Sequence, residues 1–381
     1  MDLSLNKEQV EITELVRDLV NGDIKHHVRS VHYMDDMPFD WTLLRKLGEQ
    51  NLVCPTIPRE YGGLGLSRFT TALVIEEIAA GCPGLAAIVD TNVHAVEPLL
   101  LAGNQEQKER FLPLLTGTNA GVAAFALTEA SGGSDIDSMT ACASRNQDGF
   151  LINGEKAYVL NAPIASFISL FAITDPTQKK SSMRAFIVPA NTDGCKLGKK
   201  ISYAGLNYAR GSSVIFEDAQ LGFELGIKEQ ELCSGYLLLG QTLDLGRALV
   251  GATSVGIARA AYETASEFAD TRVQFGKKIR DHQVVAHSLV DMAMKIEMAR
   301  LMTWKACWLI DQGGDYTAAS AMAKVTASVF AQEVTVAAAD LLAARGYERG
   351  TFIEQLVRDA RVLSTIEGTN NILKNLVATL L

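Results

Sequence analysis

The chain has 381 residues, of which 48% are hydrophobic and 21% are charged, as in a globular protein with a large core. Its length allows two or three domains. The net charge is −9 and no long basic block occurs, so nucleic acid and anionic membrane surfaces are poor partners. No uninterrupted apolar run reaches the roughly 18 to 20 residues that cross a bilayer, so we expect no membrane span.

The first residues are polar and acidic, unlike a secretory signal. The six cysteines are scattered and form no Cys-x-x-Cys pair, which is typical of reduced thiols in a cytoplasmic protein. The six histidines show no His-x-x-x-His or Glu-x-x-His spacing, so we expect no metal site.

Three regions that differ in their expected secondary structure follow one another along the chain. Helical spacing of apolar residues runs from residue 6 to about 118, with helices expected at 85–102 and 105–115 and a Pro- and Gly-rich loop at 57–66. Short β-rich runs broken by Gly, Asn, Asp and Pro then predict a small antiparallel barrel or sandwich. These runs are residues 122–127, 150–153, 157–160, 167–173, 184–188 and 213–216.

Long amphipathic helices are expected from residue 237 onward, at 243–269, 282–312 and 317–344, and they predict a four-helix bundle. The sequence therefore predicts an α+β multidomain protein. Its domains are a helical domain at 1–120, a β domain at 121–226 and a helical bundle at 227–381.

After residue 361, the segment from Arg358 to Leu373 contains one carboxylate, Glu367, in mainly apolar and small surroundings. Gly368 follows it and allows a turn or a close approach to a ligand. The short polar side chains from Thr369 to Asn371 suit a helix N-cap. Glu367 is either a capping residue at the surface or a general base.

This segment resembles the catalytic segment of acyl-CoA dehydrogenases, which ends in Glu-Gly-Thr followed by small polar residues. The α, β, α order is also similar, over essentially the full length. The resemblance implies FAD as cofactor and Glu367 as the base that removes the α-proton of an acyl thioester, while the β-carbon gives hydride to flavin N5. It also implies Gly368 as a substrate contact and Thr369 and Asn371 as cofactor contacts.

The resemblance further implies acyl-CoA as substrate, an electron transfer flavoprotein as electron acceptor, and a homotetramer, a dimer of dimers in which subunits share the FAD sites. The stretch from Phe125 to Asp135 is similar to the family's Thr-Glu-Pro-x-x-Gly-Ser-Asp motif, with Ala130 in place of Pro. A Gly-rich loop with hydroxyls can cradle a flavin edge or a pyrophosphate, although a plain turn is the simpler reading of this loop alone. The motif implies cofactor contacts at Leu127, Thr128 and Ser134.

The stretch from Gly154 to Asn161 is similar to the family's flavin-lining strand, which implies that Tyr158 packs against the flavin. Leu160 stands where most members have a Thr that bonds flavin N5. Asn161-Ala-Pro-Ile-Ala165 replaces the usual Asn-Gly, as in members that oxidise thioesters bound to a carrier protein. Tyr158 is otherwise an aromatic strand residue in a core.

The loop from Thr271 to Ile279 matches the family's second FAD-binding loop. The match implies that Arg272, Phe275 and Gln283 hold the FAD of the neighbouring subunit, since an Arg can grip a pyrophosphate bidentately. A later family motif, Gln-x-x-Gly-Gly, is replaced by Asp340, Ala343 and Ala344, whose methyl groups would hinder close backbone approach to the dinucleotide.

No Gly-x-Gly-x-x-Gly follows an apolar strand, so a nicotinamide site is unsupported. Some family members carry the base near Asp244, where this chain has Gly246, which leaves Glu367 as the expected base. Arg247 matches an Arg that helps to hold the thioester. Asp90 lies in the helix expected to line the acyl pocket. It is either a buried functional carboxylate that receives a polar acyl group or serves as a second base, or a satisfied core residue bonded, for example, to His94.

Two alternatives stay open. The first is a dehydrogenase of an acyl or aminoacyl thioester bound to a carrier protein. The second is a flavin-free scaffold that keeps the fold, because Leu160, Ala343 and Ala344 all depart from the family at expected cofactor contacts.

Overall fold

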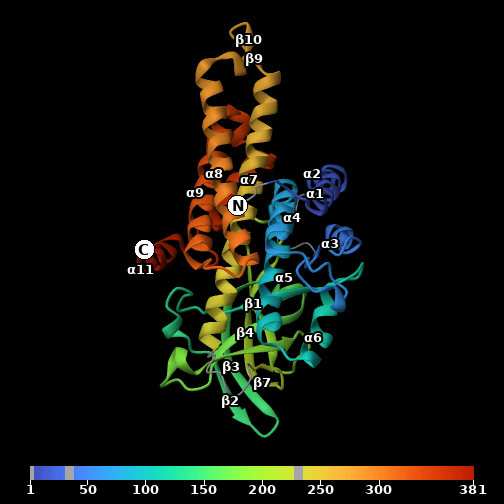
Figure 1. Cartoon of the computed structure of the whole chain (residues 1–381), viewed down its shortest axis with the longest axis vertical. Coiled ribbons are helices and arrows are strands. Elements are labelled where there is room, and N and C mark those ends of the chain that lie inside the picture. Colours follow the sequence, from blue (N-terminus) through green and yellow to red (C-terminus); the bar gives the residue numbers. More distant parts are fainter. Residues whose placement is uncertain (1–3, 31–37, 227–234) are drawn as a thin grey trace.

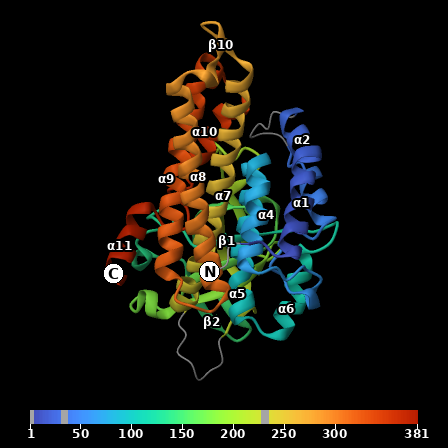
Figure 2. The same ribbon diagram turned by 45° about the horizontal axis from the view of Figure 1, so that its top comes forward.

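The computed structural model describes residues 4–30, 38–226 and 235–381. The molecule is elongated, and long C-terminal helices run along its longest axis (Figure 1). The β-sheet lies at one end of this axis and the β9–β10 hairpin lies at the other (Figure 1). The N-terminal helices lie along one side of the long helices (Figure 2).

The N-terminal region is helical, as the sequence predicts. Its helices are α1 (Lys7–Leu19), α2 (Lys25–Ser30), α3 (Thr42–Gly48), α4 (Arg68–Gly81), α5 (Pro83–Ala102) and α6 (Gln105–Phe111). Helix α5 is the one described helix that is long and apolar enough to cross a membrane, and 83% of its apolar window is buried inside the protein. Such burial is usual for the core helix of a soluble fold, so this helix is weak evidence for a membrane span.

The middle region forms an eight-stranded sheet in the order β6-β7-β3-β2-β4-β5-β8, with β1 beside β4. Its strands are β1 (Val122–Ala126), β2 (Cys142–Asn146), β3 (Gly149–Leu160), β4 (Ala165–Ile173), β5 (Met183–Pro189), β6 (Cys195–Ile201), β7 (Gly211–Leu221) and β8 (Glu224–Leu225).

The sheet is mixed, whereas the sequence analysis predicts an antiparallel one. Strands β1 and β2 both run parallel to β4, and the other ladders are antiparallel. A parallel ladder requires a long crossover connection, and here the β2–β3 hairpin lies in the chain between β1 and β4. Alternation of side chains along one strand carries no information on such a crossover.

The C-terminal region contains α7 (Gly235–Thr271), the hairpin strands β9 (Val273–Gln274) and β10 (Lys277–Lys278), α8 (Gln283–Asp311), α9 (Thr317–Leu341), α10 (Phe352–Val362) and α11 (Asn370–Leu380). Helices α7, α8 and α9 pack against one another, and α10 and α11 pack on α9. Helix α4 also packs on α7 and α8, so the N-terminal and C-terminal helices share one core. The three long helices agree with the predicted ranges.

Two features of the sheet differ from the prediction. The expected runs at 150–153 and 157–160 form one strand, β3, because its pairing with β7 continues through register shifts. Strands β2 and β6 are missed because most of their side chains are exposed or half-buried.

The predicted domain boundary at 226/227 adjoins residues 227–234, and these residues, with Cys233, lie outside the described residues.

Candidate active site

The connection between α10 and α11 places Glu367 on a tight backbone corner. Glu367 has φ +54° and Gly368 has φ +89°, both in the left-handed region. A residue with a Cβ adopts this conformation at a cost of about 1–2 kcal/mol, and such strain gathers at functional sites. Thr369 ends the corner as the N-cap of α11, since its hydroxyl accepts a hydrogen bond from Ile372 N–H, as predicted.

Long side chains from two bundle helices hold this corner. Lys324 on α9 donates from Nζ to Gly368 O and to Asn370 Oδ1, each at 2.9 Å. Arg247 on α7 donates from Nε to Glu367 O at 3.2 Å. Burial lowers the pKa of Lys324 to about 8, against the opposing attraction of Glu367. The corner is therefore fixed by bonds to its backbone, which leaves the Glu367 carboxylate free for other contacts.

Arg247 is fixed in turn by Asp244, one turn earlier on α7. The Arg247 guanidinium pairs with Asp244 Oδ1, and Asp244 Oδ2 accepts a hydrogen bond of 2.7 Å from Thr317 Oγ1. The predicted ligand-holding Arg247 is thus placed beside Glu367, with its Nε on the corner and its Nη1 on Asp244.

The Glu367 carboxylate faces His94 of α5, a residue that the sequence analysis does not assign to the site. His94 Nε2 lies 3.4 Å from Glu367 Oε2. The two atoms come close without hydrogen-bond geometry, and among the described residues both His94 nitrogens and Glu367 Oε2 have no hydrogen-bond partner. Burial lowers the pKa of the His94 imidazole, which favours its neutral form. His94 and Glu367 are 273 positions apart, so no local spacing reveals their contact.

Gly246 of α7 makes this contact possible. A Cβ at Gly246 would overlap His94 Nδ1, would lie 2.8 Å from His94 Cε1 and would lie 3.5 Å from Glu367 Oε2. The position that offers an alternative base in some relatives therefore faces the same site, and here the His94 ring fills the space beside it.

Asp90 is buried one helical turn before His94, with 9% of its surface exposed. Its carboxylate makes no hydrogen bond or ion pair within the part of the chain that the structure describes. The alternative of a core Asp bonded to His94 is wrong, because both ring nitrogens of His94 lack a hydrogen-bond partner. Burial, reinforced by the negative charge of Glu367, raises the pKa of Asp90 well above its usual value, while Arg68 opposes the rise.

An ion pair beneath the Thr128 loop joins two of the sequence motifs. Lys156 Nζ on β3 donates to Glu129 Oε1 at 2.8 Å and to Leu127 O at 2.9 Å. Glu129 also accepts hydrogen bonds from the N–H groups of Thr140 and Ala141. Burial lowers the pKa of Lys156 to about 8, and Glu129 counteracts this. Glu129 and Lys156 lie in two separate sequence motifs, so no local spacing reveals this pair, which holds the loop.

The predicted cofactor residues of this region lie on its open side. Thr128 and Leu127 are half-buried at the end of β1, Ser134 is exposed, and Tyr158 is 67% exposed with φ +54°. A Cβ at Gly133 would lie only 2.8 Å from Thr128 Oγ1, so the turn requires glycine there. An exposed aromatic ring in a strained conformation beside an open Gly-rich turn fits a planar, phosphate-bearing ligand such as FAD. The interpretation of Tyr158 as a core residue is wrong.

Buried amides tie this loop region to the acyl side of the site. Asn161, at φ +66°, donates from Nδ2 to Ala123 O at 3.0 Å and to Asn92 Oδ1 at 3.3 Å. Asn92 on α5 accepts from Ala123 N–H at 2.8 Å. Helix α5, which carries Asp90 and His94, is therefore bonded to the start of β1 at Ala123 and to Asn161 just after β3.

The second predicted cofactor group is distant from the first. Arg272, Phe275 and Gln283 are exposed at the β9–β10 end of the molecule, whereas β1 and β3 belong to the sheet at the opposite end (Figure 1). Phe275 is 94% exposed and has φ +52°. One chain thus does not bring the two groups together, and the expectation that this loop serves a neighbouring subunit stays a prediction.

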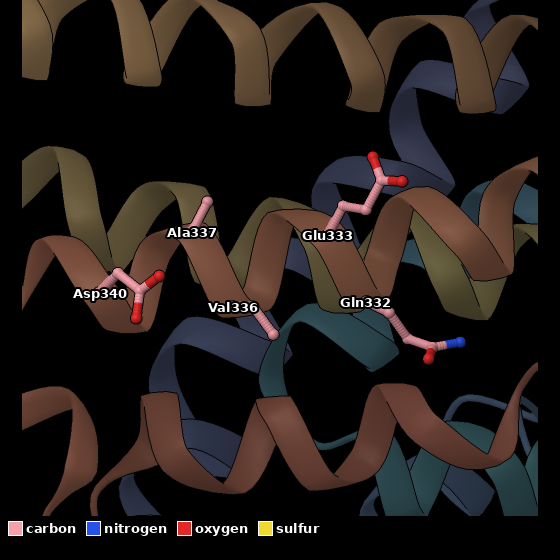
Figure 3. A pocket seen from close by; sticks show the side chains of 5 residues that line it. All are labelled: Gln332, Glu333, Val336, Ala337 and Asp340. Atoms are coloured by element: carbon pink, nitrogen blue, oxygen red, sulfur yellow. The ribbon is translucent and has the colours of Figure 1, made fainter.

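An open depression of about 410 Å³ lies on α9, away from Glu367. Side chains of α9 line it: Gln332, Glu333, Val336, Ala337 and Asp340 (Figure 3). Asp340 thus points outward, and Ala343 just beyond it has φ +54°, a conformation that glycine adopts without strain. Within residues 4–30, 38–226 and 235–381, no group of three His, Cys, Asp or Glu is arranged to hold a metal ion.

Comparisons with known proteins match this arrangement over the whole chain. Family models for the N-terminal, middle and C-terminal domains of acyl-CoA dehydrogenase match residues 6–119, 124–219 and 234–381. The chain belongs to the acyl-CoA dehydrogenase family. It is 34% identical to an acyl-CoA dehydrogenase of Bacillus subtilis over 99% of this chain and 98% of the relative. The family is one of oxidoreductases, so the chain is an enzyme of that class.

Solved structures of the same fold include proteins that are named for different substrates. Butyryl-CoA dehydrogenase from Megasphaera elsdenii superposes with a TM-score of 0.93 at 29% identity, covering 100% of this chain and 99% of that one. The prolyl acyl carrier protein oxidase AnaB superposes with a TM-score of 0.90 at 27% identity, covering 99% of both chains. The fold predicted from the sequence is confirmed, and fold alone does not select between these substrates.

Proposed function

We propose that this protein is an FAD-dependent acyl-CoA dehydrogenase in which Glu367 is the catalytic base. The observation that carries the proposal is the Glu367 corner. Its strained backbone is held by Lys324 and Arg247, while its half-buried carboxylate makes no hydrogen bond to a cation in the described part of the chain. A capping residue at the surface would need none of this support, whereas a base needs a fixed position and a free carboxylate.

The chain's residues divide the work as follows. The Glu367 carboxylate takes the proton from the α-carbon of the thioester. Arg247 and Lys324 hold the corner, so that the carboxylate meets the α-carbon without further ordering. Hydrogen bonds to the thioester carbonyl, expected from the backbone N–H of Glu367, stabilise the enolate character that develops as the proton leaves.

The Thr128 loop and Tyr158 are the residues of this subunit that would hold FAD. Leu127, Thr128 and Ser134 border the open Gly-rich turn, and Tyr158 offers an exposed ring. Thr369 and Asn371, at the start of α11, complete the predicted set. The flavin, when bound, supplies the acceptor for the hydride that leaves the β-carbon. Arg272, Phe275 and Gln283 would reach the cofactor of a neighbouring subunit, as a homotetramer would allow.

An electron transfer flavoprotein as electron acceptor and a location in the cytoplasm belong to the same proposal and rest on the family resemblance and the scattered cysteines. A carrier-bound acyl or aminoacyl thioester is the second candidate substrate. The similarity to the prolyl acyl carrier protein oxidase and the Asn161-Ala-Pro-Ile-Ala165 segment favour it.

The spectrum and turnover of the purified protein test the proposal. We expect flavin absorption bands, release of FAD on denaturation, and reduction of an artificial electron acceptor with a panel of CoA thioesters. Faster turnover with matched carrier-bound thioesters would select the second candidate. A colourless protein that takes up no added FAD would contradict the proposal and support the flavin-free scaffold.

A further inference from the structure

Helix α5 directs three polar side chains toward one side, although most of its residues are apolar. Asp90, His94 and Glu97 are spaced by four and three residues, so they follow one face of the helix. Glu97 is satisfied by a buried ion pair with Arg68 of α4. Asp90 and His94 lack such partners among the described residues. One face of α5 thus carries a paired carboxylate, Glu97, and two polar side chains without a protein partner, Asp90 and His94.

Both open groups are deeply buried. Asp90 is 9% exposed and His94 is 4% exposed, and their neighbours Val89 and Val93 are fully buried. Buried polar side chains are nearly always hydrogen-bonded, and a buried group without a partner is destabilising. Both His94 nitrogens are fully buried atoms of this kind, and the Asp90 carboxylate lies one helical turn away without a protein partner among the described residues, so a ligand that enters here would complete both side chains.

Their position relative to Glu367 shows which part of a substrate they would meet. His94 Nε2 lies 3.4 Å from Glu367 Oε2, and the His94 ring packs edge-on against Phe125, with ring centroids 4.3 Å apart. When the α-carbon of a thioester lies against Glu367, the following atoms of its acyl part therefore lie beside His94. Asp90 lies one helical turn, about 5.4 Å, farther along α5.

The charges around Asp90 favour a hydrogen-bond donor. Among the described residues, Arg68 pairs with Glu97 and Arg247 pairs with Asp244, while Lys324 is held at the Glu367 corner, so none of these three cations pairs with Asp90. Burial and Glu367 raise the pKa of Asp90, and burial lowers the pKa of His94. A group with N–H or O–H bonds supplies a partner to both side chains, whereas a hydrocarbon supplies one to neither.

We propose that Asp90 and His94 form a polar acyl subsite that binds an N–H or O–H group carried by the acyl part of the thioester. The proposal rests on the proposed function and names the substrate class for the same site. It makes Asp90 and His94 specificity-determining residues, and it leaves proton removal to Glu367.

Matched pairs of CoA thioesters test the subsite. One pair is prolyl-CoA and cyclopentanecarbonyl-CoA, in which a ring N–H replaces a CH₂ group, and the other is 4-hydroxybutanoyl-CoA and pentanoyl-CoA. We expect the wild-type enzyme to prefer at least one donor-bearing member by about tenfold or more in kcat/KM, as for one hydrogen bond to a charged group. The two pairs distinguish an amine from a hydroxyl.

Variants then assign the preference to the two side chains. Asp90→Val and His94→Phe should bring the kcat/KM ratio of the donor-bearing member to the hydrocarbon member close to one, and Asp90→Asn should lower this ratio in part. Thr91→Val is the matched control on α5, since the Thr91 hydroxyl donates only to Ala87 O of the same helix. This control should keep the wild-type preference.

Three results would overturn the proposal. The first is a wild-type enzyme that prefers the hydrocarbon members of both pairs. The second is an equal loss on both members in Asp90→Val, as expected of a second base. The third is a lowered melting temperature with unchanged preference, as expected of a structural residue. If no thioester of either pair is turned over, the proposed function fails first, and that result is distinct from all three.

Discussion

The corner at Glu367 and the loop at Arg272 were both identified from sequence motifs, yet they differ in how much of the chain surrounds them. Glu367 is held by bonds from α7 and α9 and contacts α5, so one chain builds its surroundings. Arg272, Phe275 and Gln283 are exposed at the far end of the long helices. Both segments contain a residue at φ above +50°. The strained corner at Glu367 is supported within one chain, whereas the strained loop at Phe275 is exposed, which agrees with the proposal that a neighbouring subunit completes the loop's site.

The largest effect should come from the enclosed region. Glu367→Gln keeps the size and the hydrogen-bonding capacity of the side chain but removes the base, so turnover should fall on the order of 10²- to 10⁴-fold. The measurement is kcat with the best thioester of the panel. Glu348→Gln, at an exposed position, is the control and should retain full activity. If Glu367→Gln turns over at the wild-type rate, Asp90 becomes the next candidate base.

Lys324 should make the stability of the enclosed region depend on pH. The pKa of Lys324 is about 8 in the folded protein and about 10.4 in the unfolded chain, so the unfolded state binds the proton more tightly. Stability should therefore rise with pH between about 8 and 10.4, by on the order of 3 kcal/mol, relative to Lys324→Met. Urea unfolding of both proteins across this range measures the difference. Parallel stability curves would show that Lys324 does not titrate in this range.

Arg272→Ala should affect the exposed loop without affecting the fold of the chain. The side chain is exposed, so the free energy of unfolding of the cofactor-free protein should stay within about 0.5 kcal/mol of the wild-type value. Retention of FAD should weaken about tenfold or more, because a charge-assisted hydrogen bond is lost. FAD occupancy and the oligomeric state after gel filtration measure both effects.

Lys278→Ala, in the same hairpin, is the control for this loop and should leave FAD retention unchanged. Full occupancy and an unaltered assembly in Arg272→Ala would remove the loop from the cofactor site.

Gly246→Ala probes the packing beside the base. The added methyl group overlaps the His94 ring, and overpacking of this kind costs about 1–3 kcal/mol. We expect a lower melting temperature together with reduced kcat, since the displaced ring lies against Glu367. Gly240→Ala on the same helix is the control, because a Cβ there meets nothing within 4 Å. Equal behaviour of the two variants would show that His94 moves aside freely.

Local sequence patterns predicted the structural features that depend on residues close together in the chain. The long helices, the turn at Gly368 and the cap at Thr369 follow from periodicity and residue type. Contacts between distant segments were not predictable in this way. His94 reaches Glu367 across 273 positions, Lys324 reaches Gly368 from another helix, and the parallel pairing of β1 with β4 depends on a crossover. The left-handed backbone of Glu367 itself was also missed, since Glu carries no preference for it.

The most direct test of the central claim is exchange of the α-protons of acetyl-CoA with solvent deuterium, followed by NMR. Acetyl-CoA has no β-carbon, so this exchange reports proton removal alone and is independent of hydride transfer. We predict that the wild-type holoenzyme catalyses the exchange, that Asp90→Asn still does, and that Glu367→Gln does so at least about a hundredfold more slowly. Exchange by Glu367→Gln at the wild-type rate would contradict the assignment of Glu367 as the base.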